Sequence, residues 1–276
     1  MSFPGYWMGL MMSEADSRDV AGVRTDIPHP ARIYDYWLGG KDNFAADRET
    51  AEHALELVPE MVHYARGNRQ FMVRATRFLC AAGVRQFLDI GTGFPTSPNV
   101  HEIAQQADPD ARVVYVDNDP VVFVHAGALM AKGAGTAAVH ADLRDVGNVV
   151  RQAGQLLDFS APVAVMFVAC LHHLEDHDDP AGVVARYLDA VAPGSYLVLS
   201  HCTDEFAYEK MHEGSADFKR RGGIFIPRSK DAILAMFNGR NLLDPGLVLV
   251  SRWRPDGGRP DPNAFRVMAY GGIASL

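Results

Sequence analysis

The sequence is poor in cysteine and in positive charge, and both shortages exclude classes of protein. The 276 residues include three cysteines, Cys80, Cys170 and Cys202, each within an apolar run, so buried free thiols are expected rather than a disulfide framework. Lysine and arginine total 26 against 34 acidic residues, a formal net charge of −8. Such a chain has no overall basic field to attract nucleic acid, and small-molecule partners are favoured.

Long apolar runs are also missing. No uncharged stretch reaches the roughly 20 residues that a membrane-spanning helix needs. The opening MSFPGYWMGLMM is apolar, but it lacks a basic leading region and continues directly into the polar SEADSRD, unlike a secretory signal. We therefore expect a cytoplasmic protein with no membrane partner and with a loose N-terminal segment over residues 1–30. The pattern predicts no oligomeric state.

Residues 31–84 have helical spacing and no strand signal. Leu55, Val58, Val62 and Ala65 recur at intervals of three and four residues, which is the period of one helix face. We therefore predict an N-terminal helical cap over residues 31–84, followed by a ligand-binding domain over residues 85–276.

After Gly83 the pattern changes to short β-branched runs that alternate with helical segments, which is typical of β-α-β units and a parallel sheet. Ser97, Asp119 and Asp179 stand before prolines as expected helix N-caps. The predicted strands cover residues 86–90, 112–116, 136–140, 163–168 and 196–200. The predicted helices lie near residues 98–107, 120–132, 147–157 and 180–191.

The last part of the chain predicts how the sheet is completed. Helices over residues 205–221 and 229–237 form an insertion within residues 205–240, and two strands follow at 247–253 and 265–270. Their link, RPDGGRPDPN, is too short for a crossover helix, so they should pair as an antiparallel hairpin. The expected fold is α/β with a Rossmann-like sheet of order 3-2-1-4-5-7-6 and an antiparallel last strand.

A glycine-rich turn ends the first predicted strand in DIGTGFPT, residues 89–96. Gly91 and Gly93 would let backbone amides approach a ligand, although a tight structural turn could use the same glycines. A nicotinamide site would have a third glycine where this chain has Thr96. Asp89 disfavours a diphosphate beside the turn and suits a cationic sulfonium. The turn therefore favours S-adenosylmethionine (AdoMet), with Asp89, Gly91, Thr92 and Gly93 as candidate ligands.

Acidic residues follow the second and third strands. Asp117, 24 residues beyond Gly93, could accept both ribose hydroxyls of a nucleoside, with a helix-capping role as the alternative. Asp142 could accept from an adenine amino group, with a solvated turn as the alternative. Their neighbours Asn118 and Leu143 are further cofactor-binding candidates.

The fourth strand leads into ACLHHLED, at the switch point where open α/β sheets bind ligands. Ala169 is a cofactor-binding candidate there. His172 and His173 are candidate catalytic bases because imidazole titrates near neutrality, although either could simply order the loop. The acidic and histidine residues over 172–179 lack metal-ligand spacing, so no metal site is expected.

Together these segments resemble class I AdoMet-dependent methyltransferases, with DIGTGF, VDND, HADLRD and ACLHHLED as the first four motifs. The string ARIYDYWLGGKDNFAADRE, residues 31–49, is more specifically similar to an actinobacterial S-adenosyl methyltransferase family once catalogued as a domain of unknown function. The resemblance extends over about residues 27–274. It implies AdoMet as cofactor and methyl transfer to a small-molecule acceptor. One departure is Pro95, which stands where the common first motif has a third glycine.

The N-terminal segment over residues 34–44 mixes aromatic residues, a Gly-Gly break and polar groups, as loops that close over ligands do. Tyr36, Lys41 and Asn43 are candidates for contacting the AdoMet carboxylate or the acceptor, and packing within the cap is the alternative. Arginines at 66, 69, 74 and 77 could form a basic stripe for an anionic acceptor, but a solvated helix face is the favoured interpretation. Arg228 is a weaker candidate for acceptor binding, in the insertion that would lie on the acceptor side.

Three functions remain open from the sequence. The leading hypothesis is AdoMet-dependent methyl transfer to a small molecule. The second is an AdoMet-binding regulatory module that transfers nothing, and the third is a nicotinamide oxidoreductase, which Thr96 and the terminal hairpin disfavour.

Overall fold

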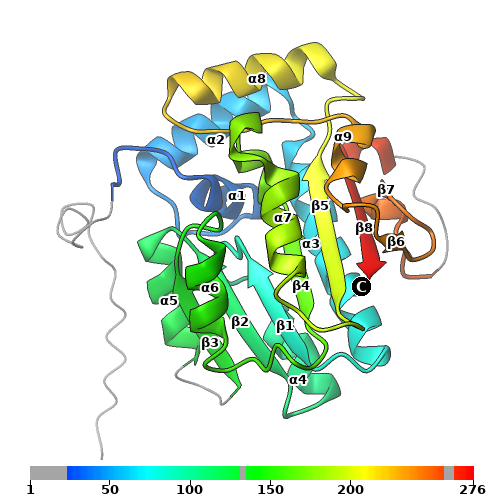
Figure 1. The fold of residues 1–276 in the computed structure, drawn as a ribbon. Helices are drawn as coiled ribbons and strands as arrows, with labels where there is room; N and C mark the ends of the chain where they lie inside the picture. The colour runs from blue at the N-terminus through cyan, green and yellow to red at the C-terminus, as the bar shows by residue number, and fades with distance from the viewer. Residues whose placement is uncertain (1–23, 131–134, 258–263) are drawn as a thin grey trace, which may run out of the picture.

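A mixed sheet runs through the molecule and divides its core into two layers (Figure 1). The computed structural model describes residues 24–130, 135–257 and 264–276. The strands lie in the order β3-β2-β1-β4-β5-β8-β6, and β7 also pairs with β8. Their bounds are β1 Gln86–Ile90, β2 Arg112–Asp117, β3 Thr136–His140, β4 Ala164–Val168, β5 Tyr196–Cys202, β6 Asn241–Leu242, β7 Val248–Leu249 and β8 Ala269–Ser275.

The sheet topology agrees with the prediction. Strands β1 to β5 pair in parallel, whereas β8 lies antiparallel to β5 and pairs with β7 through Val248 and Gly271. The short β6 was not predicted, and it shifts the numbering of the last strands by one. The order 3-2-1-4-5-7-6 with an antiparallel last strand is therefore confirmed.

Helices cover both faces of this sheet because the buried strands are apolar on both sides. Leu88 and Ile90 of β1 pack toward the layer that contains α6 and α7, and Phe87 packs toward α3 and α4. The bounds are α1 Pro30–Leu38, α2 Ala45–Leu57, α3 Met61–Ala81, α4 Val100–Ala107, α5 Pro120–Met130, α6 Val146–Ala153, α7 Pro180–Leu188, α8 Tyr208–Arg220 and α9 Lys230–Ala235.

The N-terminal helices do not act as one layer. Figure 1 shows α1 and α2, together with α8, across the end of the sheet where the parallel strands finish. The long helix α3 instead packs against the sheet itself, through buried residues such as Phe71, Ala75 and Leu79. Residues 1–23, most of the segment predicted to be loose, lie outside the described residues. Within the described part, α1 already begins at Pro30.

Three local predictions need correction. Helix α4 begins at Val100 rather than near Pro98, because the Glu102 carboxylate accepts the Asn99 amide at 2.8 Å and the Ser97 hydroxyl at 2.8 Å. The strand predicted over 247–253 ends at Leu249, since the buried Arg74 guanidinium binds the next backbone carbonyls, of Val250 and Trp253. The strand predicted over 265–270 forms later, as β8, after a 3-10 turn.

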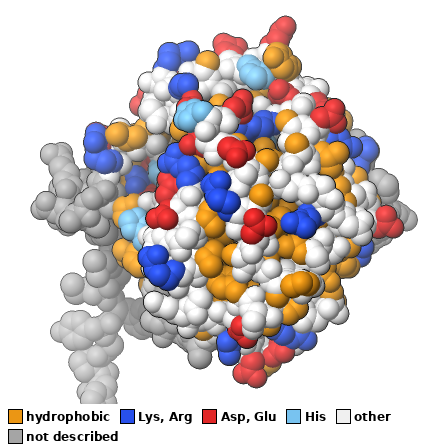
Figure 2. All heavy atoms as spheres, in the orientation of Figure 1, with side chains coloured by type: hydrophobic (Ala, Val, Ile, Leu, Met, Phe, Trp, Pro, Cys, Tyr) orange, Lys and Arg blue, Asp and Glu red, His pale blue; other side chains and the backbone are white. Residues whose placement is uncertain are grey.

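Surface and core properties complete the fold. Cys80, Cys170 and Cys202 are buried free thiols, as predicted. The face in Figure 2 carries intermixed acidic and basic side chains, without a continuous basic area among its described residues. Within the described ranges, no helix is long and apolar enough to cross a membrane.

Candidate functional site

A cavity of about 370 Å³ opens where β1, β2 and β4 end. Its volume lies within the range typical of small-ligand sites, and its position is the one at which open α/β sheets bind ligands. Most of the predicted site residues line it. They are Asp89, Gly91, Thr92, Gly93, Asp117, Asn118, Asp142, Leu143, Ala169 and His173.

The glycine turn has the backbone conformation that glycine favours. Gly91 and Gly93 have φ angles of 67° and 64°, in the left-handed region. A Cβ on Gly91 would lie 2.4 Å from the Cβ of Cys170, whereas a Cβ on Gly93 would meet no described atom within 4 Å. The first glycine therefore allows close packing against the loop after β4, and the second leaves open space beside the cavity.

Asp117, at the end of β2, joins two parts of the site. Its carboxylate accepts the Gly93 amide at 2.8 Å and the Asp119 amide at 2.9 Å, one on each oxygen. Burial raises the pKa of Asp117, and these two hydrogen bonds act in the opposite direction. Each oxygen keeps a lone pair for a further donor. A buried carboxylate that lines the cavity can therefore accept two hydroxyl groups of a ligand.

Asp89 lies at the end of β1, beneath the turn. The Thr92 hydroxyl donates to its carboxylate at 3.1 Å, and burial raises the pKa of Asp89 to about 6. The charge of Arg69, a residue of α3 that also lines the cavity, acts to lower that pKa. The predicted solvated helix face is wrong for Arg69, whose guanidinium also binds the backbone carbonyls of Thr96 and Pro98.

The far wall of the cavity follows β3. Arg144 holds the Asp142 carboxylate through two hydrogen bonds of 3.0 and 2.6 Å and also reaches Asp178 at 2.8 Å. The hydrogen bond from Arg144 lowers the pKa of Asp142. The Leu143 carbonyl accepts the Tyr187 hydroxyl at 2.9 Å. These contacts hold Asp142 and Leu143, the residues predicted to bind the adenine, in fixed positions.

The two predicted catalytic histidines occupy different surroundings. Nδ1 of His173 donates to the Ile224 carbonyl at 2.6 Å, so Nε2 carries the lone pair of the neutral ring. Burial lowers the pKa of His173 to about 4. His172 is 2% exposed, burial holds its pKa well below the ordinary value, and it lines a second cavity instead. His173 lines both cavities.

Arg228 holds the loop that carries these histidines. Its buried guanidinium donates to the carbonyls of Leu171 and Leu174 and to the Asp176 carboxylate at 2.7 Å. It also lies 3.1 Å from Nε2 of His201. Arg228 is therefore a support for the loop, and it does not line either described cavity.

The candidates Tyr36, Lys41 and Asn43 line neither of the two described cavities. The Tyr36 hydroxyl donates to Glu52 at 2.8 Å, Lys41 is exposed, and the Asn43 amide donates to Asp35 at 2.9 Å. The way this segment folds locally accounts for the position of Asn43.

The chain wraps tightly around the Asp35 carboxylate, which also accepts the Asp42 amide at 2.9 Å. A Cβ on Gly40 would lie 1.9 Å from an Asp35 oxygen, so this glycine serves the wrap. The same N-terminal segment is anchored to the site by Arg32, whose guanidinium forms a buried ion pair with Asp119 at 2.8 Å.

A buried series of hydrogen bonds, which was not predicted from the sequence, reaches the cavity from α1 and α3. The Asn68 amide donates to the Tyr34 hydroxyl at 3.1 Å and accepts the Ser200 hydroxyl at 2.5 Å. The Ser200 oxygen in turn accepts the Ala169 amide at 3.1 Å. Ala169 has a φ of 60°, which costs an alanine energy and persists where neighbours enforce it. The sequence signal for this series is Asn68, a polar residue on an otherwise apolar helix face.

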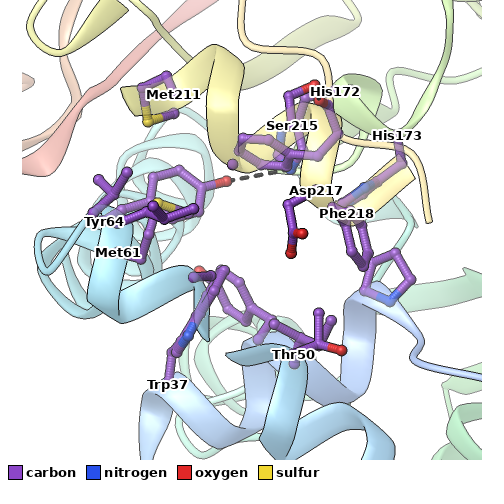
Figure 3. A pocket seen from close by; sticks show the side chains of 18 residues that line it. Trp37, Thr50, Met61, Tyr64, His172, His173, Met211, Ser215, Asp217 and Phe218 are labelled. Carbon is purple, nitrogen blue, oxygen red and sulfur yellow. Dashed lines mark hydrogen bonds between the residues drawn. The ribbon is translucent and has the colours of Figure 1, made fainter. Parts of the chain in front are cut away.

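Figure 3 shows the second cavity, which lies between α1, α2, the start of α3 and α8. It has a volume of about 70 Å³. The labelled side chains converge on it from these helices and from the His172–His173 loop. Among the described residues, no cluster of three or more His, Cys, Asp or Glu side chains is arranged to hold a metal.

Comparisons with known proteins agree with this geometry. A sequence model of the S-adenosyl methyltransferase family matches residues 16–276. A Thermobifida fusca protein provisionally named a methyltransferase is 40% identical, with a TM-score of 0.85 over 91% of this chain and 95% of that one. A DUF574 family protein from Streptomyces avermitilis is also 40% identical, with a TM-score of 0.86 over 91% of this chain and 99% of that one.

More distant comparisons concern the fold alone. An O-methyltransferase family protein from Burkholderia thailandensis is 16% identical, with a TM-score of 0.50 over 78% of this chain and 59% of that one. No curated protein matches the chain.

Proposed function

Since the chain belongs to the S-adenosyl methyltransferase family, we propose that it transfers the methyl group of AdoMet to a small-molecule acceptor where its two cavities meet. The observation that carries this proposal is Asp117, a buried carboxylate that lines a ligand-sized cavity and keeps a free lone pair on each oxygen beside the open space at Gly93. Family membership does not favour the purely regulatory alternative.

The residues of the larger cavity fit AdoMet. Asp117 would accept the two ribose hydroxyls, and Asn118 would lie next to the ribose. Asp142 and the backbone of Leu143 would meet the adenine. Three carboxylates, of Asp89, Asp117 and Asp142, line this cavity together with the guanidinium groups of Arg69 and Arg144. Because Arg144 is already paired with Asp142, the remaining carboxylates of Asp89 and Asp117 suit a positively charged ligand better than a diphosphate.

The methionine part of AdoMet would be bound differently from the way the common motif binds it, because Pro95 replaces the third glycine of that motif. The turn over Gly91 to Gly93, with Ala169 opposite, would hold the amino group together with the carboxylate of Asp89. Arg69 would pair with the methionine carboxylate. Its guanidinium is already positioned by the carbonyls of Thr96 and Pro98, so little side-chain entropy is lost on binding.

AdoMet, when bound, supplies an electrophilic methyl group: the acceptor's lone pair bonds to the methyl carbon, and the S–CH₃ bonding pair stays on sulfur to give S-adenosylhomocysteine. The protein mainly aligns the two reactants and excludes water. His173 can then receive the proton that the acceptor loses, because its Nε2 lone pair is free while Nδ1 is fixed on Ile224. His172, on the second cavity, would position the acceptor.

Calorimetry with AdoMet, S-adenosylhomocysteine and NAD tests this assignment. We expect both adenosyl ligands to bind and NAD to give no heat. Losing a charge-assisted hydrogen bond costs about 1.5–3 kcal/mol, so Asp117→Asn should weaken AdoMet binding by about 10- to 150-fold. The exposed Asp110 provides the control, and Asp110→Asn should bind like the wild type. Binding of NAD alone, or an unchanged affinity in Asp117→Asn, would contradict the proposal.

A further inference from the structure

The second cavity is lined mostly by apolar and aromatic side chains. Trp37 of α1, Met61 of α3, and Met211 and Phe218 of α8 surround it (Figure 3), and Phe225 also lines it. Aromatic rings and methionine thioethers bind flat apolar groups through dispersion and edge-to-face contacts. The walls therefore suit a compact ring more than a sugar or a peptide.

This cavity lies beside the proposed AdoMet cavity, and the two have three wall residues in common. Pro30, Tyr34 and His173 line both. The shared boundary is the place where Nε2 of His173 has a free lone pair. An occupant of the second cavity can thus present one end to the AdoMet cavity and keep its body between α1, α3 and α8.

The charges of the wall residues further restrict which compounds the second cavity can bind. Of the described residues that line the second cavity, none is a lysine or an arginine, and the acidic one is Asp217. The Asp217 carboxylate is already held by Arg220 at 2.8 Å and Arg221 at 3.0 Å. A buried charge without a partner is strongly unfavourable. The cavity therefore selects an uncharged occupant.

Tyr64, His172 and His173 bring a group of polar atoms together on one part of the cavity wall. The Tyr64 hydroxyl lies 3.4 Å from Nε2 of His172, and the dashed line in Figure 3 marks this contact along the cavity wall. Nδ1 of His172 is buried and has no hydrogen-bond partner among the described residues. The neighbouring His173 places this polar part of the wall beside the AdoMet cavity.

We propose that the methyl acceptor is an uncharged single-ring compound with a hydroxyl or amino group on the ring. Its ring lies among Trp37, Met211 and Phe218, and its heteroatom lies at the His172–His173 end. A cavity of about 70 Å³ is smaller than the roughly 150 Å³ that encloses a benzene molecule, so a fused ring system is excluded and a single ring would fill the cavity and extend through its opening. This inference rests on the proposed function, because it assigns the acceptor for that same reaction.

A cavity-filling variant tests the assignment without touching the AdoMet site. Gly214 of α8 lines the second cavity, and a Cβ there would meet only Leu57, at 4.0 Å, among described atoms. Gly214→Leu should therefore fill the ring position, and leucine favours the helix more than glycine does. Gly147→Leu is the matched control, since Gly147 is a helical glycine with open space around it on the exposed surface of α6.

The probes are p-cresol and p-toluidine, with 4-hydroxybenzoate as the charged counterpart, measured by saturation-transfer NMR with S-adenosylhomocysteine present. We expect both neutral probes to bind the wild type and the Gly147→Leu protein. In Gly214→Leu their binding should weaken by at least about tenfold, and 4-hydroxybenzoate should bind the wild type at least about tenfold more weakly than p-cresol.

Calorimetry on the same proteins distinguishes failure of the proposed function from failure of the acceptor assignment. S-adenosylhomocysteine should bind all three proteins equally, and its failure to bind the wild type would overturn the proposed function itself. If it binds all three while the neutral rings do not bind, or bind Gly214→Leu as well as the control, the acceptor assignment is wrong. Preference for 4-hydroxybenzoate over p-cresol would overturn it too.

Discussion

Alanine at Gly91 should damage the protein much more than alanine at Gly93, two residues away. Both positions have a left-handed backbone, which costs an L residue about 1–2 kcal/mol. Only at Gly91 would the new Cβ collide with described atoms, at 2.4 Å from the Cβ of Cys170. Overpacking of a buried site adds about 1–3 kcal/mol. The free energy of unfolding should therefore fall by about 2–5 kcal/mol for Gly91→Ala and by about 1–2 kcal/mol for Gly93→Ala.

Urea denaturation followed by circular dichroism measures both values. A double mutant assigns the cause, because Cys170→Gly removes the Cβ that causes the clash. The Gly91→Ala penalty should shrink in the Cys170→Gly background by about 1–3 kcal/mol, and the Gly93→Ala penalty should not change there.

The loss of AdoMet affinity, measured on the folded variants, should be larger for Gly93→Ala than for Gly91→Ala. A Cβ at Gly93 enters the open space beside the cavity, so Gly93→Ala should weaken AdoMet binding while most of the stability remains. Equal destabilisation by the two alanines, or a Gly91→Ala penalty that Cys170→Gly leaves unchanged, would refute this reasoning about the turn.

Three further predictions concern charge. Burial raises the pKa of Asp89 to about 6, so between about pH 4 and 6 the folded protein binds more protons at this residue than the unfolded chain does. The free energy of unfolding should therefore fall by at most about 3 kcal/mol as pH rises through that window. Asp89→Asn should remove this pH dependence in urea titrations. Arg32→Met removes the guanidinium from the buried Asp119, which keeps the His29 ring at 3.2 Å, and should lower the free energy of unfolding by up to about 3–5 kcal/mol. Arg24→Met, at an exposed pair, should leave the urea midpoint unchanged. Since the pKa of His173 lies near 4, His173 should contribute no decline in the methyl-transfer rate from pH 8 to pH 5.5 when AdoMet is saturating. A decline centred near pH 6.5 that disappears in His173→Gln would contradict the assigned environment.

The sequence predicted the sheet well because its strands are apolar on both faces and are separated by helix-length segments. Residues 86–90 and 136–140 match β1 and β3 at both ends. Parallel strands bring their carboxyl ends to one edge, so Asp89, Asp117 and Asp142 had to lie close together once the strand order was known. This logic needs only local pattern and topology.

The remaining site residues depend on contacts that no local pattern encodes. Tyr34 and Tyr36 are both aromatic residues of α1, yet Tyr34 lines the cavity and Tyr36 donates to Glu52, because residues two apart on a helix point to different sides. Which of these sides faces the cavity depends on how α1 packs. The role of Arg69 depends on the crossing of α3 over the turn after β1. Arg74, on the same helix, is buried because it binds carbonyls about 180 residues away in sequence.

The most direct test of the account is transfer of label from methyl-labelled AdoMet to a small molecule. The protein is incubated with an extract of low-molecular-weight metabolites, and labelled products are separated by chromatography. The account predicts a labelled ring compound with wild-type protein and with Asp110→Asn, and none with Asp117→Asn at an AdoMet concentration that saturates the wild type. Persistent absence of labelled product while AdoMet binds, or equal labelling by Asp117→Asn, would contradict it.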